Sequence, residues 1–98
     1  MTLRYGIFDE QGERISSAEI DALTCDCCQT DSALANEAVV LAYRDRTEAE
    51  IRDILVTRYI AGEWSEPVRV HADEWKIDGC PVNGPAIAAD GEQVAVTW

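Results

Sequence analysis

The sequence predicts an all-β protein built from short antiparallel strands. Its apolar residues alternate with polar ones or run in short blocks, and turn-forming residues bound each block. Helical spacing of apolar residues is hard to find. Only "RTEAEIRD", residues 46–53, has a helix-like composition, and a charged loop explains that stretch equally well.

The eight expected strands form four hairpins. Each hairpin consists of two strands around a short turn rich in polar residues or glycine, as at Gly12 and at Asn36 with Glu37. Pro67 indicates an edge or irregular strand, because it has no N–H to donate to a ladder. The hairpins join residues 3–8 to 15–20, 31–35 to 38–44, 52–60 to 64–70, and 85–89 to 93–98.

A repeat organises these hairpins. "DSALANEAVVLAYRD" and "GPAIAADGEQVAVTW" both run from a strand of small residues through a polar turn to a β-branched strand and an aromatic residue. The unit between the copies spans about fifty residues and four strands. This matches the antiparallel four-stranded blade of a β-propeller, with about two blades in the chain. A β-sandwich of the immunoglobulin type is the alternative fold.

The repeat also divides the single domain, residues 1–98. We expect a half blade in residues 1–20, a full blade with its loops in 21–79, and a second half blade in 80–98. Each copy of the repeat follows a cysteine at nearly the same distance, Cys28 in one case and Cys80 in the other. Cys80 is therefore expected to face the "CDCC" cluster.

Charge excludes two classes of partner. Eight basic residues against nineteen acidic ones give a net charge of −11, which repels nucleic acid and anionic lipid surfaces. No apolar run has the roughly 20 residues that a membrane helix needs, and the N-terminus lacks the pattern of a secretory signal. The chain as given is expected to be cytoplasmic, with neither nucleic acid nor a membrane as partner.

Several motifs together resemble a known family. "GEWSEPVRV" looks like a degenerate form of the blade-end pattern of sialidase-like BNR-repeat propellers. "CDCCQTD", "AYRDR" with "IRDI", and "CPVNGPAIAADG" resemble a bacterial group of that family, usually named exo-α-sialidases. The resemblance covers about residues 20–98 and implies a six-bladed propeller and exported longer relatives.

In such propellers, the loops from the fourth strand to the next blade and from the second to the third strand share the ligand-binding face. The resemblance therefore implies a face with six polar or aromatic candidates beside the cysteines. The candidates for ligand contact are Arg44, Asp45, Arg46, His71, Trp75 and Asn83.

Arg44 is similar to the first of the three arginines that bind the substrate carboxylate in sialidases. No other arginine has a comparable context, and no Tyr–Glu nucleophile pair is identifiable on the proposed face. An ion pair between Arg44 and Asp45 that holds a loop is the simpler interpretation. We therefore expect the isolated chain not to be an enzyme; a sialidase-like glycoside hydrolase acting on sialoglycans, as a fragment or an oligomer, is the alternative.

The cysteines allow three interpretations. A disulfide from Cys80 to one of Cys25, Cys27 and Cys28 fits the exported relatives, and buried reduced thiols are the second possibility. A metal bound by these residues with His71 is disfavoured, because the C-x-C-C spacing directs neighbouring side chains apart. We expect neither a metal nor another cofactor, a solvated His71, and a Trp75 that could stack on a sugar.

Incomplete half blades would expose strand edges and apolar faces, which drive association. Residues 93–98 of one copy could pair with residues 3–8 of the next in a head-to-tail ring. We expect a homotrimer with six blades, a strand-exchanged dimer as the second choice, and a monomer otherwise. The function that fits is a non-catalytic assembly or glycan-binding module.

Overall fold

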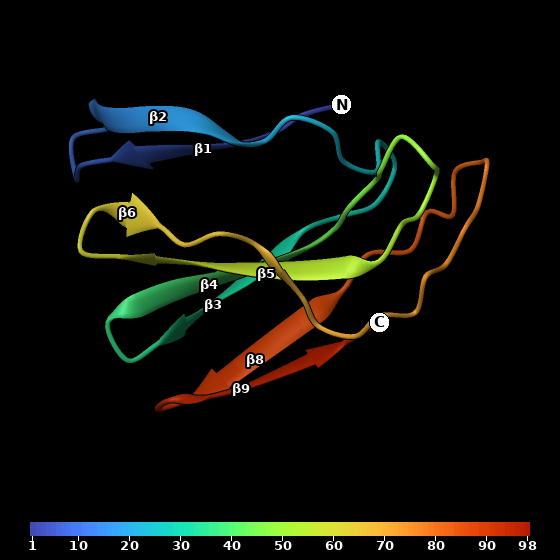
Figure 1. The fold of residues 1–98 in the computed structure, drawn as a ribbon. Helices are drawn as coiled ribbons and strands as arrows, with labels where there is room; N and C mark the ends of the chain where they lie inside the picture. The colour runs from blue at the N-terminus through green and yellow to red at the C-terminus, as the bar shows by residue number, and fades with distance from the viewer.

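The computed structural model describes residues 1–98, which form nine strands in three antiparallel sheets and no helix. The all-β prediction is therefore confirmed. Figure 1 shows the sheets fanned one above another, with the hairpin turns gathered at one end and the long loops at the other. A membrane-spanning helix is accordingly not among its elements.

The central sheet has the strand order β3-β4-β5-β6, and β7 also pairs with β5. Pro67 divides the expected strand 64–70, so that Trp64 pairs with Tyr59 on one side of it and Val68 with Val56 on the other. Together β6 and β7 act as one interrupted fourth strand, as a proline at an edge predicts. The five strands are β3 (Asp31–Ala35), β4 (Ala38–Arg44), β5 (Ile54–Ile60), β6 (Glu63–Trp64) and β7 (Val68–Arg69).

A two-stranded hairpin lies on either side of the central sheet (Figure 1). One is formed by β1 (Leu3–Phe8) and β2 (Arg14–Asp21), the other by β8 (Ala86–Asp90) and β9 (Gln93–Thr97). Neither hairpin shares a backbone ladder with the central sheet. Both are therefore held by side-chain contacts.

Different contacts hold the two hairpins. On the first, the Tyr5 ring lies 5.9 Å from the ring of Tyr59 and 5.4 Å from that of Trp64, centroid to centroid. This is the range in which aromatic pairs contribute beyond their buried area. On the second, the N–H of Ile87 donates to the Asp31 carboxylate over 2.9 Å. Thus β1 faces β5 and β6, and β8 faces β3.

The hydrophobic core lies in the central sheet. Only 14 of the 98 residues are buried, and none of them belongs to β1, β2, β8 or β9. Val40, Tyr43 and Ile54 are the largest apolar side chains that are fully enclosed. In the outer hairpins, β1, β8 and β9 alternate between exposed and half-buried positions, and most of β2 is exposed. Each hairpin therefore has a face that the rest of the chain does not cover.

Residues 46–53 form an irregular loop rather than a helix. The Thr47 hydroxyl accepts a hydrogen bond from the N–H of Ile51, and Glu50 adopts a φ of 65°. A left-handed residue cannot continue a right-handed helix, so the side chain of Thr47 stabilises a turn instead. Of the two interpretations of this stretch, the charged loop is correct.

The hairpin turns adopt the backbone that their residues favour. At the turn between β5 and β6, Ala61 and Gly62 have φ values of 53° and 83°. Two successive positive values are typical of the type I′ turn, whose twist matches that of the flanking strands. Glycine meets this requirement at the second position without strain.

Candidate functional site

The long loops meet where β4 ends and β5 begins. Because these strands are antiparallel, Arg44 at the end of β4 lies opposite Ile54 at the start of β5. The N–H of Cys25 donates to the carbonyl oxygen of Arg44 over 3.1 Å, and the N–H of Arg52 donates to that of Trp75 over 2.9 Å. Backbone pairing therefore fixes the cysteine loop and the Trp75 loop against the same strand ends.

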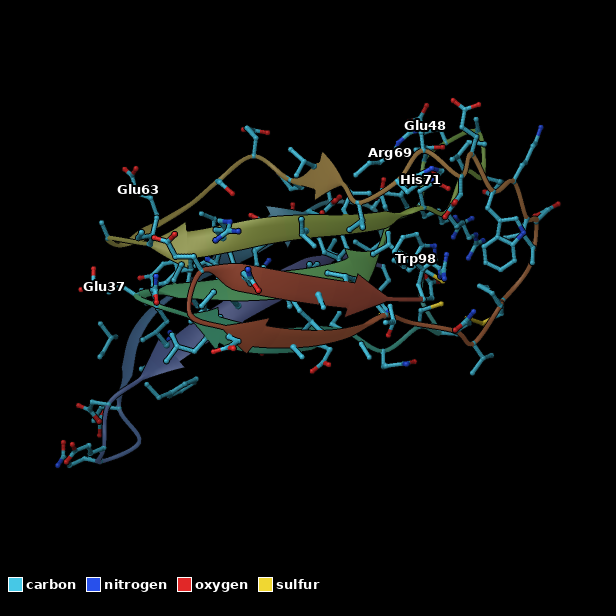
Figure 2. The ribbon with its side chains drawn as sticks, turned by 90° about the horizontal axis from the view of Figure 1, so that it is seen from below. Glu37, Glu48, Glu63, Arg69, His71 and Trp98 are labelled. Atoms are coloured by element: carbon cyan, nitrogen blue, oxygen red, sulfur yellow. A yellow bond between two sulfur atoms is a disulfide. The ribbon has the colours of Figure 1, made fainter.

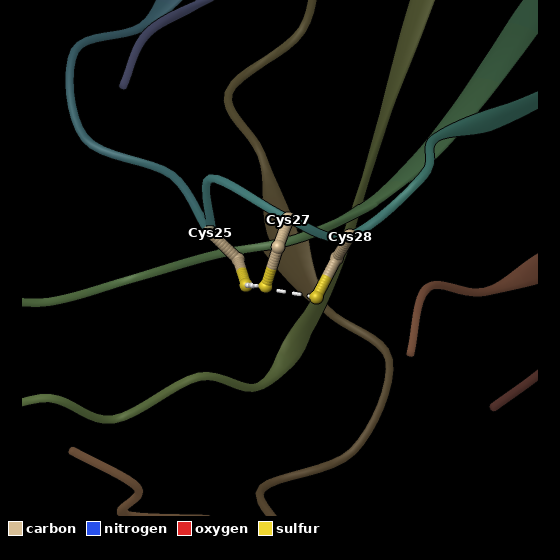
Figure 3. Close-up of side chains that lie close together, drawn as sticks. All are labelled: Cys25, Cys27 and Cys28. Atoms are coloured by element: carbon tan, nitrogen blue, oxygen red, sulfur yellow. Dashed lines mark hydrogen bonds between the residues drawn. The ribbon is translucent and has the colours of Figure 1, made fainter. Parts of the chain in front are cut away.

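The cysteine cluster lies in this region, and its three neighbouring side chains converge in Figure 3. The Sγ atom of Cys25 is 2.8 Å from that of Cys28 and 3.9 Å from that of Cys27. Cys27 forms a disulfide with Cys80, with the two Cα atoms 6.0 Å apart, a separation typical of disulfides. The sequence left open a disulfide at Cys80 or buried reduced thiols. In the structure Cys80 is in a disulfide, and Cys25 and Cys28 are free thiols.

Two residues, Asp26 and Cys27, separate Cys25 from Cys28. The motif C-x-C-C therefore also contains a C-x-x-C pair. The Nη1 atom of the Arg52 guanidinium lies 3.4 Å from the Cys25 sulfur. Burial disfavours a charged Cys25, but hydrogen bonds from Cys28 and Arg52 outweigh it and lower the pKa of the Cys25 thiol. Burial and the hydrogen bond to Cys25 raise the pKa of Cys28, so of the two thiols Cys25 loses its proton more readily.

Arg44 is directed inward. Only 3% exposed, it donates from Nε to the carbonyl oxygen of Asn83 and from Nη1 to that of Arg52, each over 2.6 Å. Its guanidinium carbon lies 4.8 Å from the centre of the Trp75 ring, in cation–π contact. Arg44 thus joins three loop segments.

The expected ion pair between Arg44 and Asp45 is not formed. Successive side chains of a strand point to opposite faces, and these two residues are consecutive at the end of β4. Asp45 instead lies near Asp21, whose carboxylate accepts a 2.7 Å hydrogen bond from the Tyr43 hydroxyl. Burial, followed by the Asp21 carboxylate, raises the pKa of Asp45, so two acidic groups share this corner.

Asp53 positions the Trp75 loop. Its carboxylate, 2% exposed, accepts hydrogen bonds from the N–H groups of Glu74 (2.8 Å) and Trp75 (2.9 Å) and pairs with Arg69 at 3.4 Å. A buried carboxylate is tolerable when it is satisfied in this way. Trp75 itself is 38% exposed, so its ring contacts both Arg44 and solvent.

Arg46 lies beside the cysteine loop. It pairs with Glu50 at 2.9 Å and with Asp26 at 4.0 Å. The hydrogen bond from Arg46 and a second one from Arg52 lower the pKa of Glu50. Arg46 thereby links the cysteine loop to the irregular loop between β4 and β5.

His71 makes no hydrogen bond to the cysteine cluster. Its exposed ring lies 3.0 Å from the Asp73 carboxylate, which also accepts a 2.7 Å hydrogen bond from the Trp98 indole. The Trp98 bond, and then that of His71, lower the pKa of Asp73. In Figure 2, His71 and Trp98 lie on the loop side, away from Glu37 and Glu63 at the hairpin turns.

Sequence reasoning assigned no role to two central residues, Arg52 and Asp53. Both are at most 5% exposed. The signal was present in "IRDI", where two charged residues stand directly before an apolar strand. Charged residues so placed are buried only if they have partners. Arg52 pairs with Glu50, two residues before it, whereas its contact with Cys25 and the hydrogen bonds to Asp53 come from loops distant in the sequence.

The largest hollow of the surface lies elsewhere. It has a volume of about 760 Å³ and is lined at the hairpin-turn end by residues that include Asn36, Arg58 and Glu92. None of the candidate site residues borders it. The cysteine cluster and the Arg44–Trp75 pair therefore form a packed junction rather than a pocket.

Comparison with known proteins gives no relative: no protein-family model, curated protein or solved structure matches the chain. The family resemblance therefore stays an expectation, and the function is argued from the structure.

Proposed function

We propose that this chain is a non-catalytic assembly module whose central sheet is one complete propeller blade and whose outer hairpins are half blades. The observation that carries the proposal is that each outer hairpin has only two strands. The edge of β1 is unpaired in the first hairpin, and the edge of β9 is unpaired in the second. A second copy can supply the missing strands, β9 of one chain pairing with β1 of the next. The order β8-β9-β1-β2 would then repeat the order of the central sheet.

The packing of the hairpins supports this order. In a propeller, equivalent strands of neighbouring blades face one another. In the proposed blade β8-β9-β1-β2, β1 is the third strand, and it lies against β5, the third strand of the central sheet. Similarly β8, a first strand, lies against the first strand β3. A β-sandwich has two sheets, whereas this chain forms three that follow one another along the chain.

Exposed surface also favours assembly. The solvent-accessible area is 6226 Å², against about 5,500 Å² for a folded monomer of this mass. Apolar side chains contribute to it: on the first hairpin Phe8 is 59% exposed and Ile15 67%, and Trp98, the residue after β9, is 46% exposed. Unpaired edges next to uncovered apolar faces are features that association removes.

The number of copies is proposed from the family resemblance, which implies a six-bladed ring. Because residues 1–98 supply about two blades, three copies would complete such a ring. We therefore favour a homotrimer over a strand-exchanged dimer.

Hydrolysis of sialoglycans is less well supported. Arg44 already uses Nε and Nη1 on backbone carbonyl oxygens and is 3% exposed, which leaves little of it for a substrate carboxylate. Glycan binding is the second candidate function, because Trp75 offers a partly exposed ring beside polar loops. Stabilisation by a glycan in thermal unfolding, lost in Trp75→Ala, would favour this alternative.

Sedimentation equilibrium of the 98-residue chain tests the assembly proposal. We expect three times the chain mass of 10.8 kDa at micromolar concentration. A monodisperse species of 10.8 kDa would contradict the proposal. Deletion of residues 1–9, which removes β1, should abolish the oligomer, because β9 then has no strand to pair with.

A further inference from the structure

All four cysteines of the chain lie in one cluster. The Sγ atoms of Cys25, Cys27 and Cys28 lie within 4.8 Å of one another, and the sulfur of Cys80 is bonded to that of Cys27. Four sulfurs around a tetrahedral zinc ion, each about 2.3 Å from the metal, are about 3.8 Å apart. The 3.9 Å between Cys25 and Cys27 matches this spacing, and the 2.8 Å between Cys25 and Cys28 opens to it by a small side-chain rotation.

We propose that the reduced cluster is a four-sulfur binding site for Zn²⁺, and that the Cys27–Cys80 disulfide is its closed, metal-free form. The ligands are Cys25, Cys27, Cys28 and Cys80. This inference does not rest on the assembly function, since every ligand comes from one chain.

The spacing objection from the sequence does not hold in the folded chain. Neighbouring side chains in an extended strand point apart, but residues 25–28 contain a turn at Asp26 and Cys27 and form no strand. As Figure 3 shows, the sulfurs of Cys25, Cys27 and Cys28 converge. Cys25 and Cys28 have the two-residue separation typical of structural zinc sites, and Cys80 arrives from a separate loop, as a fourth ligand usually does.

The surrounding charges suit a metal with four thiolates. Such a centre carries a net charge of −2, which a buried position tolerates only with nearby cations. Arg52 lies 3.4 Å from the Cys25 sulfur, is 5% exposed, and has a buried Nε with no hydrogen-bond partner. Arg44 adds a second guanidinium, which makes no ion pair with a carboxylate. The backbone carbonyl oxygen of Arg44 accepts the N–H of Cys25, so Arg44 adjoins the cluster.

The ligand set also selects the metal class. Thiolates are soft ligands that discriminate against Mg²⁺ and Ca²⁺, and four of them favour tetrahedral zinc over copper(I), which takes fewer. Asp26 and Glu50 are the nearby carboxylates, and each is already paired with an arginine or the N-terminus. The sulfurs are therefore the groups that remain for an ion.

Opening the site is a balanced exchange with a thiol reductant. A dithiol gives two electrons and two protons to the Cys27–Cys80 bond, becomes a disulfide itself, and leaves two thiols on the protein. Binding of Zn²⁺ then releases the protons of the four thiols. Disulfide formation and metal binding compete for Cys27 and Cys80, so zinc protects the reduced form.

Titration of the protein with Co²⁺ and Zn²⁺ tests the proposal. The chain is reduced with a phosphine under anaerobic conditions, and far-UV circular dichroism confirms that it stays folded. We expect one Co²⁺ per chain with the intense visible bands of a tetrahedral thiolate site, displaced by one equivalent of Zn²⁺. In the oxidised chain the disulfide blocks two of the four ligands. We expect it to bind either metal more than about 100-fold more weakly than the reduced chain, a larger loss than removal of an outer-shell contact causes.

Variants identify the ligands. Cys25→Ser and Cys80→Ser should each weaken Zn²⁺ binding by more than about 100-fold, whereas Arg52→Gln should weaken it about 10-fold through the outer shell. His71→Ala is the matched control, because it removes the only histidine and should change nothing. Since serine variants could unfold, protection of the wild-type thiols from alkylation by Zn²⁺ gives an independent measurement.

A folded, reduced chain without bound metal would overturn the proposal. So would octahedral Co²⁺ that survives in the cysteine variants, equal affinity of the reduced and oxidised chains, or wild-type thiols that alkylate at the same rate with and without Zn²⁺.

Discussion

At the scale of single residues, the Tyr43 hydroxyl provides a clear test of a buried polar contact. Tyr43 is 1% exposed and donates to Asp21 over 2.7 Å. Tyr43→Phe keeps the ring but leaves the carboxylate without this donor, at a cost of about 1.5–3 kcal/mol in the free energy of unfolding. Urea denaturation measures the loss.

Tyr5→Phe is the matched control for that substitution. Its ring contacts Tyr59 and Trp64, and these contacts do not need the hydroxyl. We expect a change below about 0.5 kcal/mol. Equal losses for the two variants would show that the Tyr43 hydroxyl contributes nothing specific.

Asp45 should make stability depend on pH. Burial and then Asp21 raise its pKa in the folded state above the unfolded value, so the folded state holds this proton more tightly. The stabilisation from this group is therefore full at low pH and is lost as the pH rises through the folded-state pKa. Asp45→Asn should be more stable than the wild type at neutral pH, with the difference vanishing in acid.

The comparison of urea midpoints between variant and wild type isolates this effect. Glu50 and Asp73, whose pKa values are lowered, act in the opposite direction but equally in both proteins. Asp78→Asn, at an exposed loop position, controls for the loss of one negative charge. An Asp45→Asn advantage that is the same at acid and neutral pH would contradict the assignment.

At the scale of elements, Gly84 determines how the Cys80 loop docks on the cysteine loop. Its N–H donates to the Gln29 side chain over 3.1 Å, and a Cβ atom at this position would collide with the Gln29 backbone. Gly84→Ala should therefore destabilise the fold by about 1–3 kcal/mol. It should also accelerate reduction of the Cys27–Cys80 disulfide, because the loop is displaced.

Gly79→Ala makes the same chemical change five residues earlier in the same loop, where a Cβ atom would meet nothing within 4 Å. We expect it to match the wild type in urea midpoint and in the rate of reduction by dithiothreitol. If both alanine variants behaved alike, the close approach of Gly84 to Gln29 would not control the docking.

The elements that the sequence predicted well are those with local signals. Alternating apolar residues and turn formers predicted the hairpins, and Pro67 predicted the interrupted strand. The site was less accessible. The Arg44–Asp45 ion pair was wrong because strand alternation separates the two side chains. Cys25 contacts Arg52, and Glu74 and Trp75 donate to Asp53, from loops that only the fold brings close. Local sequence patterns therefore predict strands and turns, whereas contacts between residues far apart in the sequence become apparent only in the folded structure.

At the scale of the whole molecule, the apolar core lies mainly in the middle one of the three sheets. The outer hairpins have no buried residue of their own, and an isolated two-stranded hairpin is marginally stable in water. Their stability should therefore depend on what covers them. In the proposed assembly, neighbouring copies provide that cover.

A charged side chain on the outer face of β9 tests this dependence. Ala95 is exposed and lies opposite Ala88 on β8. The two alanines form a small apolar patch that lines a shallow hollow. In a ring this face would be buried against the next blade, where an unpaired lysine is costly to desolvate. In a monomer it remains in water, where a surface substitution changes stability by less than about 0.5 kcal/mol.

Ala95→Lys should therefore lower the mass in sedimentation equilibrium toward that of a single chain. Gln11→Lys, at the exposed tip of the β1–β2 turn, adds the same charge away from any proposed contact and should leave the mass unchanged. An oligomer that tolerates Ala95→Lys would show that this face is not an interface and that β9 is not completed by another copy. Added positive charge reduces the repulsion between chains that carry a net charge of −11, so it cannot by itself dissociate them. Dissociation with both variants would therefore show that the effect of Ala95→Lys is not specific to this face.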